Sequence, residues 1–159
     1  MRMSKCVAMA GLAAALSGAH AAAADFQLNG RVLGERLDAV LSDERFDCAG
    51  ESACFLMTAC SHKHPAEESL LGAPLGGLTL HYAGERVAAI EARFPSAAFD
   101  AVVAAKQREH GEPESARPDL VVWRQGSRVL RVERDFEGSG QASLIISQHS
   151  YLGELIKAP

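Results

Sequence analysis

The residues most able to do chemistry are concentrated between Cys48 and His64, in the stretch CAGESACFLMTACSHKH. Three cysteines occur at C-x5-C-x5-C spacing, and an H-x-H pair follows them. Thiolates and imidazoles are ligands for zinc and copper, whereas cysteines in an oxidising compartment form disulfides. The segment therefore predicts a metal site, a redox site or a disulfide. A thioredoxin-like redox site is disfavoured, because it requires C-x-x-C.

Three cysteines predict one disulfide and one unpaired thiol. If the segment FLMTA is extended, Cys54 and Cys60 lie at opposite ends of a strand, about 20 Å apart. Cys48 is then the partner of one of them. We favour a disulfide between Cys48 and Cys54, because Gly50 allows a tight loop between them. The alternative is Cys48 with Cys60.

The favoured pairing leaves the Cys60 thiol beside His62 and His64. Alternation in an extended segment points these three side chains the same way, so they are the candidate ligands for zinc or copper. A structural zinc site normally takes four ligands, however, and the following KHPAEES is typical of an exposed loop. We therefore expect a disulfide with solvated histidines and no cofactor, with a zinc or copper site as the alternative.

Two further candidates lie at aligned positions of an internal similarity. The segments LTLHYAGERVAAIEARF (78–94) and LVVWRQGSRVLRVERDF (120–136) share six of seventeen residues. Either two glycine-turn hairpins look alike, or a helix-plus-hairpin unit is duplicated. If the repeat is genuine, His81 and Trp123 lie on the same kind of sheet face, where a tryptophan would be a binding anchor. The alternative is that a helix or the C-terminal segment covers Trp123.

The pattern of alternation, caps and turn residues predicts a mixed fold. The expected elements are a short helix within 34–43, a strand at 54–60, hairpins at 78–94 and 120–136, a helix from Ser96 to His110 and a strand at 143–147. We therefore predict an α+β domain, with an antiparallel sheet built from hairpins and two or three helices packed on one face.

The first 24 residues have the pattern of a signal peptide. Arg2 and Lys5 precede an apolar run at 6–16, and small residues lead to Asp25. The run is shorter than the roughly 20 residues that span a bilayer. We expect cleavage after Ala24, a periplasmic or secreted location, no stable membrane insertion, and one domain over 25–159.

The composition excludes nucleic acid as a partner and offers no enzyme motif. Without Arg2 and Lys5, 14 basic residues face 20 acidic ones, a net charge of −6, and nucleic-acid binding relies on basic clusters. No G-x-S-x-G, H-E-x-x-H, P-loop or dinucleotide motif is present. We therefore expect binding rather than catalysis.

The order helix, hairpin, helix, hairpin over 30–148 resembles the small periplasmic modules of the SmpA-like outer-membrane assembly lipoproteins and the β-lactamase inhibitors. In those families a sheet face or loops grip a protein, so the resemblance implies a protein partner of inhibitor, immunity or assembly type. Cys6 lies inside the apolar run, so it is not placed for the lipidation of an assembly lipoprotein. The expected function is an exported soluble binding protein. The alternative is a metal-binding envelope protein using the Cys/His cluster.

Overall fold

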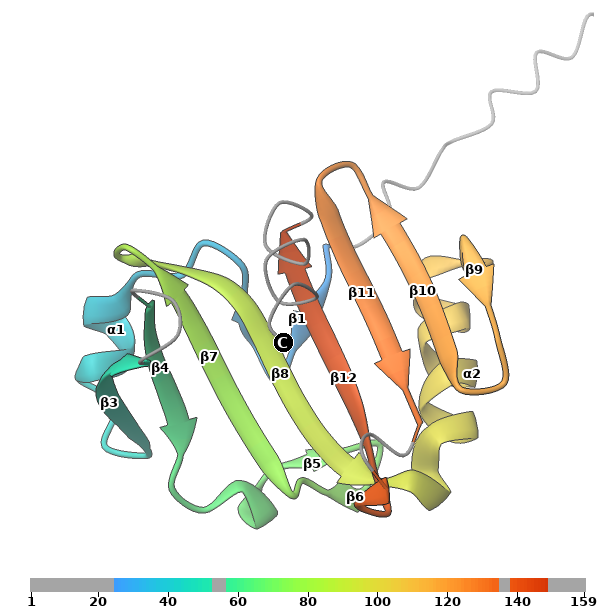
Figure 1. Cartoon of the computed structure of the whole chain (residues 1–159), viewed down its shortest axis with the longest axis horizontal. Helices are drawn as coiled ribbons and strands as arrows, with labels where there is room; N and C mark the ends of the chain where they lie inside the picture. The colour runs from blue at the N-terminus through green and yellow to red at the C-terminus, as the bar shows by residue number, and fades with distance from the viewer. Residues whose placement is uncertain (1–24, 53–56, 135–137, 149–159) are drawn as a thin grey trace, which may run out of the picture.

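The computed structural model describes residues 25–52, 57–134 and 138–148. Eight strands form one antiparallel sheet in the order β3-β4-β7-β8-β12-β11-β10-β9 (Figure 1). Their bounds are β3 Phe46–Ser52, β4 Met57–His62, β7 Gly77–Ala83, β8 Arg86–Pro95, β9 Ser115–Ala116, β10 Leu120–Gln125, β11 Arg128–Glu133 and β12 Gln141–Gln148. The predicted hairpins at 78–94 and 120–136 and the strand at 143–147 are confirmed as β7–β8, β10–β11 and β12.

Two small hairpins and two helices complete the described chain. The hairpins pair β1 (Gln27–Leu28) with β2 (Arg31–Val32) and β5 (Ser69–Leu70) with β6 (Ala73–Pro74). The helices are α1 (Leu37–Leu41) and α2 (Phe99–His110), with 3-10 turns η1 (Pro65–Glu67) and η2 (Ser96–Ala98). In the described residues, no helix combines the length and apolar character needed to cross a membrane.

The predicted α+β class, with two or three helices on one face, is wrong. The fold is mostly antiparallel β-sheet, and α2 is the only helix longer than five residues in the described part. The predicted helix within 34–43 is reduced to the five residues of α1, in which only Val40 is buried and Leu41 is 61% exposed. Leu37 packs against the core beside Val40. A helix this short gains little from its own hydrogen bonds, and this one contact does not make it a second layer-forming helix.

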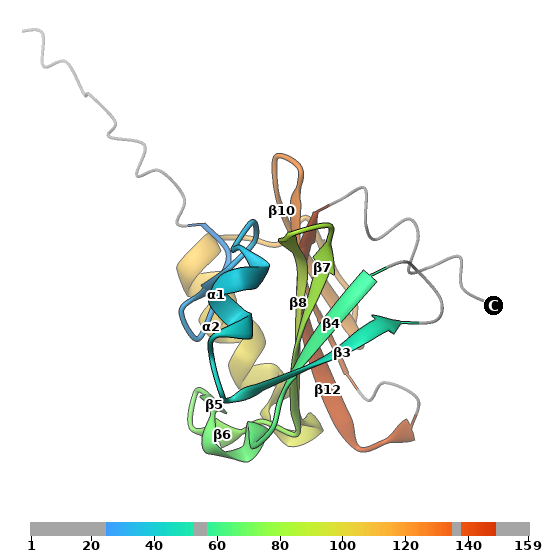
Figure 2. The same ribbon diagram turned by 90° about the vertical axis from the view of Figure 1, so that its left-hand side faces the viewer.

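One face of the sheet, the covered face, packs against the helices and small hairpins (Figure 2). Strand alternation points Leu78, Leu80 and Tyr82 of β7 to this side, where they are buried with Ile90 of β8 and Leu144 of β12. Burial of apolar side chains stabilises a fold by about 25 cal/mol per Å² removed from water. This layer between sheet and helix is therefore the hydrophobic core.

The helix α2 lies on the covered face through a stripe at helical spacing. Phe99 and Val102 are buried in the core, and Val103 packs against it. Gly111 follows the helix with a positive φ of 80°, a conformation that glycine adopts without strain. The predicted helix from Ser96 to His110 is confirmed, and its first turn is the 3-10 turn η2.

Candidate functional site

The disulfide joins Cys48 to Cys60, and the predicted pairing of Cys48 with Cys54 is wrong. β3 and β4 are antiparallel neighbours in which Cys48 stands directly opposite Cys60, with 4.0 Å between the two Cα atoms. The prediction failed because the cysteines face each other across two strands rather than across a tight loop. Cys54 lies outside the described residues.

The predicted metal set of Cys60, His62 and His64 is not brought together. The Cys60 sulfur is part of the disulfide, so it is not a thiolate ligand. The side chain of His62 is 2% exposed and packs edge-on against the Phe46 ring, whereas His64 is exposed. The His62 Nδ1 accepts a hydrogen bond from the His64 backbone N–H at 3.2 Å. In the described ranges, no three His, Cys, Asp or Glu residues are grouped to hold a metal ion.

His81 and Trp123 lie on opposite faces of the sheet, so the predicted shared face is wrong. Trp123 is 2% exposed in the core, and its Nε1–H donates to the Gly111 carbonyl oxygen at 2.9 Å. It ties the end of α2 to β10 and is not available as a binding anchor. His81 alternates with the buried Leu80 and Tyr82, which places it on the face away from α2.

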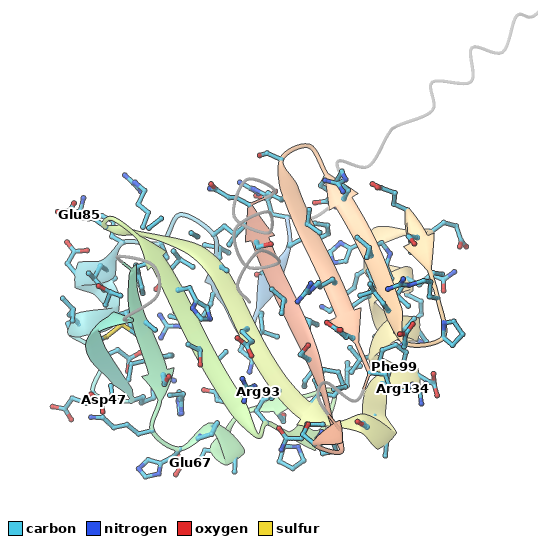
Figure 3. All side chains as sticks on the ribbon, viewed as in Figure 1. Asp47, Glu67, Glu85, Arg93, Phe99 and Arg134 are labelled. Atoms are coloured by element: carbon cyan, nitrogen blue, oxygen red, sulfur yellow. A yellow bond between two sulfur atoms is a disulfide. The ribbon has the colours of Figure 1, made fainter. Side chains whose placement is uncertain are left out.

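We call this second surface the polar face, because charged side chains extend across it. Figure 3 shows Arg93 on this side of β8, and none of the described helices lies on it (Figure 2). The cross-strand pairing places the members side by side from β7 to β10. They are His81 of β7, Glu91 and Arg93 of β8, Arg131 and Glu133 of β11, and Arg124 of β10.

A histidine, a carboxylate and a guanidinium are linked on the β7–β8 side of the polar face. The Glu91 carboxylate lies 3.4 Å from the His81 Nε2 and accepts a hydrogen bond from the Arg93 Nε at 3.0 Å. The contact with His81, together with that of Arg93, holds the pKa of Glu91 below its ordinary value against the opposing effect of burial. Glu91 is therefore a fixed anion, and the Arg93 side chain remains 54% exposed.

Further charges alternate in sign on the β10–β11 side. Arg131 lies 3.5 Å from the Glu133 carboxylate, and the Arg124 Nε donates to Glu114 at 2.9 Å. These side chains are partly exposed, so each pair contributes little to stability. Their arrangement presents cations and anions in a fixed pattern across several strands.

Buried side chains lie between these charges. Ala89, Ser143 and Ser147 point to the polar face and are buried, as are the larger Val129 and Ile145 on the same face. The Oγ atoms of both serines and the Nε of Arg131 have no hydrogen-bond partner in the part of the chain that the structure describes. An unpaired buried polar atom costs about 1–3 kcal/mol, so these three atoms are a cost that the described contacts leave uncompensated on this side of the sheet.

The spacing of charged residues in the sequence is a signal for this surface, although it matches no catalytic or metal-binding motif. Glu91 and Arg93 are two residues apart in one strand, and Arg131 and Glu133 are two apart in another. Residues spaced by two share a strand face, so each strand predicts a local ion pair on its outer side. Nothing in the sequence alone shows that the two strands lie in the same sheet with one strand between them.

Comparison with known proteins yields no match. No family model matches the chain, and no match was found among the curated proteins or the solved structures. The resemblance to SmpA-like and β-lactamase-inhibitor modules therefore remains a prediction.

Proposed function

We propose that this chain is an exported, non-enzymatic binding protein that holds a protein partner on its polar face. The observation that carries this proposal is the fixed pattern of charges around His81, Glu91, Arg93 and Arg131, with buried polar atoms between them that lack hydrogen-bond partners. Oriented charges of both signs are suited to recognising a complementary surface.

The size of the polar face favours a protein over a small molecule. Seven inter-strand spacings of about 4.8 Å make the sheet about 34 Å wide, and eight residues of β12 extend about 27 Å. The area is on the order of 900 Å², comparable to the roughly 800 Å² that each partner contributes to a standard interface.

The chemistry of the partner follows from the two arginines that are partly exposed on the polar face. The Arg93 side chain is 54% exposed beyond its contact with Glu91, and the Arg131 side chain is 20% exposed beyond its contact with Glu133. Arginine binds carboxylates in a bidentate manner and is enriched at the centres of interfaces. We therefore expect acidic side chains of the partner opposite Arg93 and Arg131.

The location proposed from the leader sequence agrees with the cysteine chemistry. A disulfide between Cys48 and Cys60 is stable in a periplasm or outside the cell and is rare in reducing cytosol. The partner is accordingly expected among exported or envelope proteins.

The test is site-directed photo-crosslinking in the native host. A photoreactive residue at Thr79, on the polar face, is expected to give a discrete protein adduct, and one at the exposed Ala104 of α2 is not. Charge reversal by Arg93→Glu with Arg131→Glu should lower the adduct yield at least about tenfold, because reversed charges in an interface repel the partner. The matched control is Arg108→Glu, an exposed arginine of α2.

Two outcomes would contradict this proposal. Equal adducts from Thr79 and Ala104 would remove the polar face as the specific surface. Full adduct yield after the double charge reversal would show that Arg93 and Arg131 take no part. Far-ultraviolet circular dichroism of each variant establishes that the sheet is retained.

A further inference from the structure

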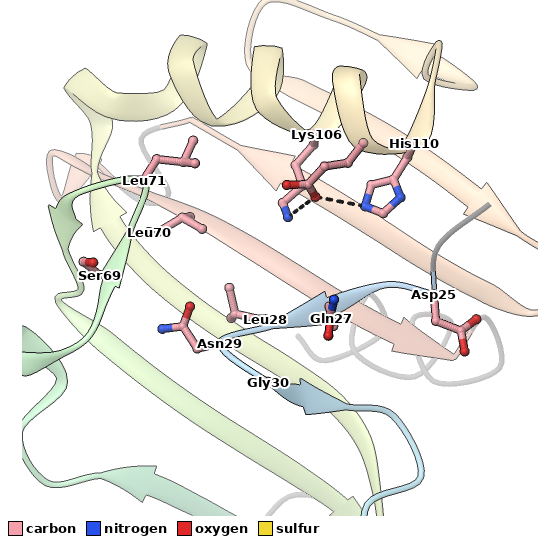
Figure 4. Close-up of a pocket in the computed structure, with 11 residues that line it drawn as sticks. Asp25, Gln27, Leu28, Asn29, Gly30, Ser69, Leu70, Leu71, Lys106 and His110 are labelled. Atoms are coloured by element: carbon pink, nitrogen blue, oxygen red, sulfur yellow. Dashed lines mark hydrogen bonds and ion pairs between the residues drawn. The ribbon is translucent and has the colours of Figure 1, made fainter. Parts of the chain in front are cut away.

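A pocket of about 450 Å³ lies on the covered side of the sheet, away from the polar face. It is bounded by the C-terminal half of α2 and by the hairpins β1–β2 and β5–β6 (Figure 4). Its apolar lining is Leu28, Leu70 and Leu71, and its main ionisable groups are Lys106, Glu109 and His110. This volume falls within the range of small-ligand sites.

His110 is a buried polar side chain that points into this pocket. It is 4% exposed, it packs edge-on against the Phe26 ring, and neither ring nitrogen has a hydrogen-bond partner among the described residues. Burial, with the nearby Lys106 ammonium, lowers the pKa of His110, so the ring is neutral and offers one donor and one acceptor.

Lys106 is the second buried ionisable residue of α2 that lines the pocket. The spacing of Phe99, Val102 and Lys106 continues an apolar pattern, yet this position carries an ammonium group that is 8% exposed. Its Nζ donates to the Glu109 Oε2 at 2.6 Å and retains two further N–H donors. A lysine and a histidine on the buried face of a helix indicate a site for a polar group.

Glu109 already places a carboxylate between these two side chains. Its Oε2 lies 2.6 Å from the Lys106 Nζ and 3.4 Å from the His110 Nε2 (Figure 4). The Glu109 side chain is 49% exposed, so it can rotate into solvent without losing a packed environment. The pocket thus contains a position for a carboxylate, which the Glu109 side chain occupies and can leave by rotating into solvent.

The backbone conformation of Leu71, which lines the pocket, is an independent indication of a ligand site. It occupies the turn between β5 and β6 with φ of 52°, and it is 57% exposed. The corresponding turn of β1–β2 uses Asn29 and Gly30, the residues that such left-handed two-residue turns prefer. A leucine in this conformation is strained, and strain of this kind concentrates at ligand sites.

We propose that this pocket binds a small aliphatic monocarboxylate. Its carboxylate replaces that of Glu109 between the Lys106 Nζ and the His110 ring, and its alkyl chain lies on Leu28, Leu70 and Leu71. A cation is disfavoured, because Lys106 repels it and the Asp25 carboxylate at the rim is paired with Arg128. This site is independent of the proposed protein partner, which uses the opposite face.

The first test compares hexanoate with 1-hexanol by isothermal titration calorimetry on the purified protein. Hexanoate should bind at least tenfold more tightly, because only the carboxylate can engage Lys106. Butanoate should bind on the order of tenfold more weakly than hexanoate, since each buried CH₂ contributes about fourfold. Equal affinity for acid and alcohol, or no binding up to about 10 mM, would overturn the proposal.

Variants of α2 separate the contributions of the two charged residues. Lys106→Met should weaken hexanoate binding at least tenfold, whereas Glu109→Gln should strengthen it several-fold by removing the competing anion. Arg108→Met is the control, because Arg108 is exposed on the same helix and does not line the pocket. Unchanged binding in Lys106→Met, or weaker binding in Glu109→Gln, would contradict the proposed geometry.

Leu71→Asn distinguishes ligand binding from folding. Asparagine suits the left-handed turn before Gly72, so this variant should raise the melting temperature by roughly 4 °C. Loss of the apolar contact should nevertheless weaken hexanoate binding about fivefold. Unchanged affinity would show that Leu71 is outside the site.

Discussion

The hairpins β7–β8 and β10–β11 share a residue pattern but turn their first strands toward opposite faces of the sheet. His81 of β7 lies on the polar face, whereas the aligned Trp123 of β10 is buried on the covered face. The strand order explains this difference. β7 and β10 run in the same direction, but β8 and β11 lie on opposite sides of them (Figure 1). One hairpin is therefore turned over relative to the other.

In the second strands, β8 and β11, the aligned Glu91 and Glu133 point to the same face of the sheet, because β8 contains a bulge. His81 pairs with Ala89 and Tyr82 with Val87, so Ala88 is an extra residue in β8. An extra residue shifts the alternation by one position. Glu91 and the aligned Glu133 consequently both lie on the polar face. A similar pair of sequences thus determines two similar hairpins, while neighbouring strands and bulges determine which side chains are buried.

The largest expected effect on stability comes from truncating Trp123, and truncating the aligned His81 of the other hairpin provides the comparison. Trp123→Ala should lower the free energy of unfolding by about 3–5 kcal/mol, because it opens a cavity and removes the bond to the Gly111 carbonyl. His81→Ala should change it by less than about 1 kcal/mol, since His81 is partly exposed. Urea denaturation followed by circular dichroism measures both.

One result would contradict the opposite orientation of the two hairpins. If Trp123→Ala and His81→Ala lowered the free energy of unfolding by similar amounts, both side chains would be equally buried, and the two residues would not lie on opposite faces of the sheet. Trp123→Phe is the conservative control. It retains an aromatic ring without the indole N–H, so it should recover part of the stability.

The hairpin β3–β4 extends the comparison to a pair of strands that is joined covalently. Replacing Cys48 and Cys60 together with alanine should lower the free energy of unfolding by about 3 kcal/mol, because the bond restrains the unfolded chain over a separation of 12 residues. A reductant should lower the urea midpoint of the native protein and leave the variant unchanged. A midpoint of the native protein that does not respond to complete reduction would contradict this expectation.

Local patterns predicted much of the secondary structure. The alternation in LTLHY and SLIIS, the glycine turns and the stripe from Phe99 predicted strands and a helix that the structure contains. The hairpin β1–β2 was missed although Asn29-Gly30 is a strong turn signal, because only two residues flank the turn on each side. The short helix predicted within 34–43 is present as α1, but its predicted apolar face is only partly buried, because Leu37 and Val40 contact the core while Leu41 is 61% exposed.

The candidate sites were less accessible to sequence because they depend on contacts between distant segments. The choice between Cys54 and Cys60 as the partner of Cys48 required the register of β3 against β4. Lys106 was visible as an ionisable residue in an apolar stripe, but the pocket beside it is completed by Leu28 and Leu70 from two other hairpins. Spacing along one element cannot reveal such a cavity.

The smallest expected effect is a difference between Glu91 and the aligned Glu133 in how much each contributes to the pH dependence of stability. The folded pKa of Glu91 lies below its ordinary value of 4.5, because His81 and Arg93 favour the carboxylate. Its contribution to stability is therefore complete above pH 4.5 and is lost as the pH falls through the folded pKa. The native protein should lose more stability between pH 6.5 and pH 3.5 than Glu91→Gln, by less than about 1 kcal/mol.

Glu133→Gln is the matched control, because the counterpart of His81 on its hairpin is the buried Trp123. Urea midpoints at the two pH values measure the effect, and an equal loss in the native protein and Glu91→Gln would show that the contacts of Glu91 do not stabilise this face.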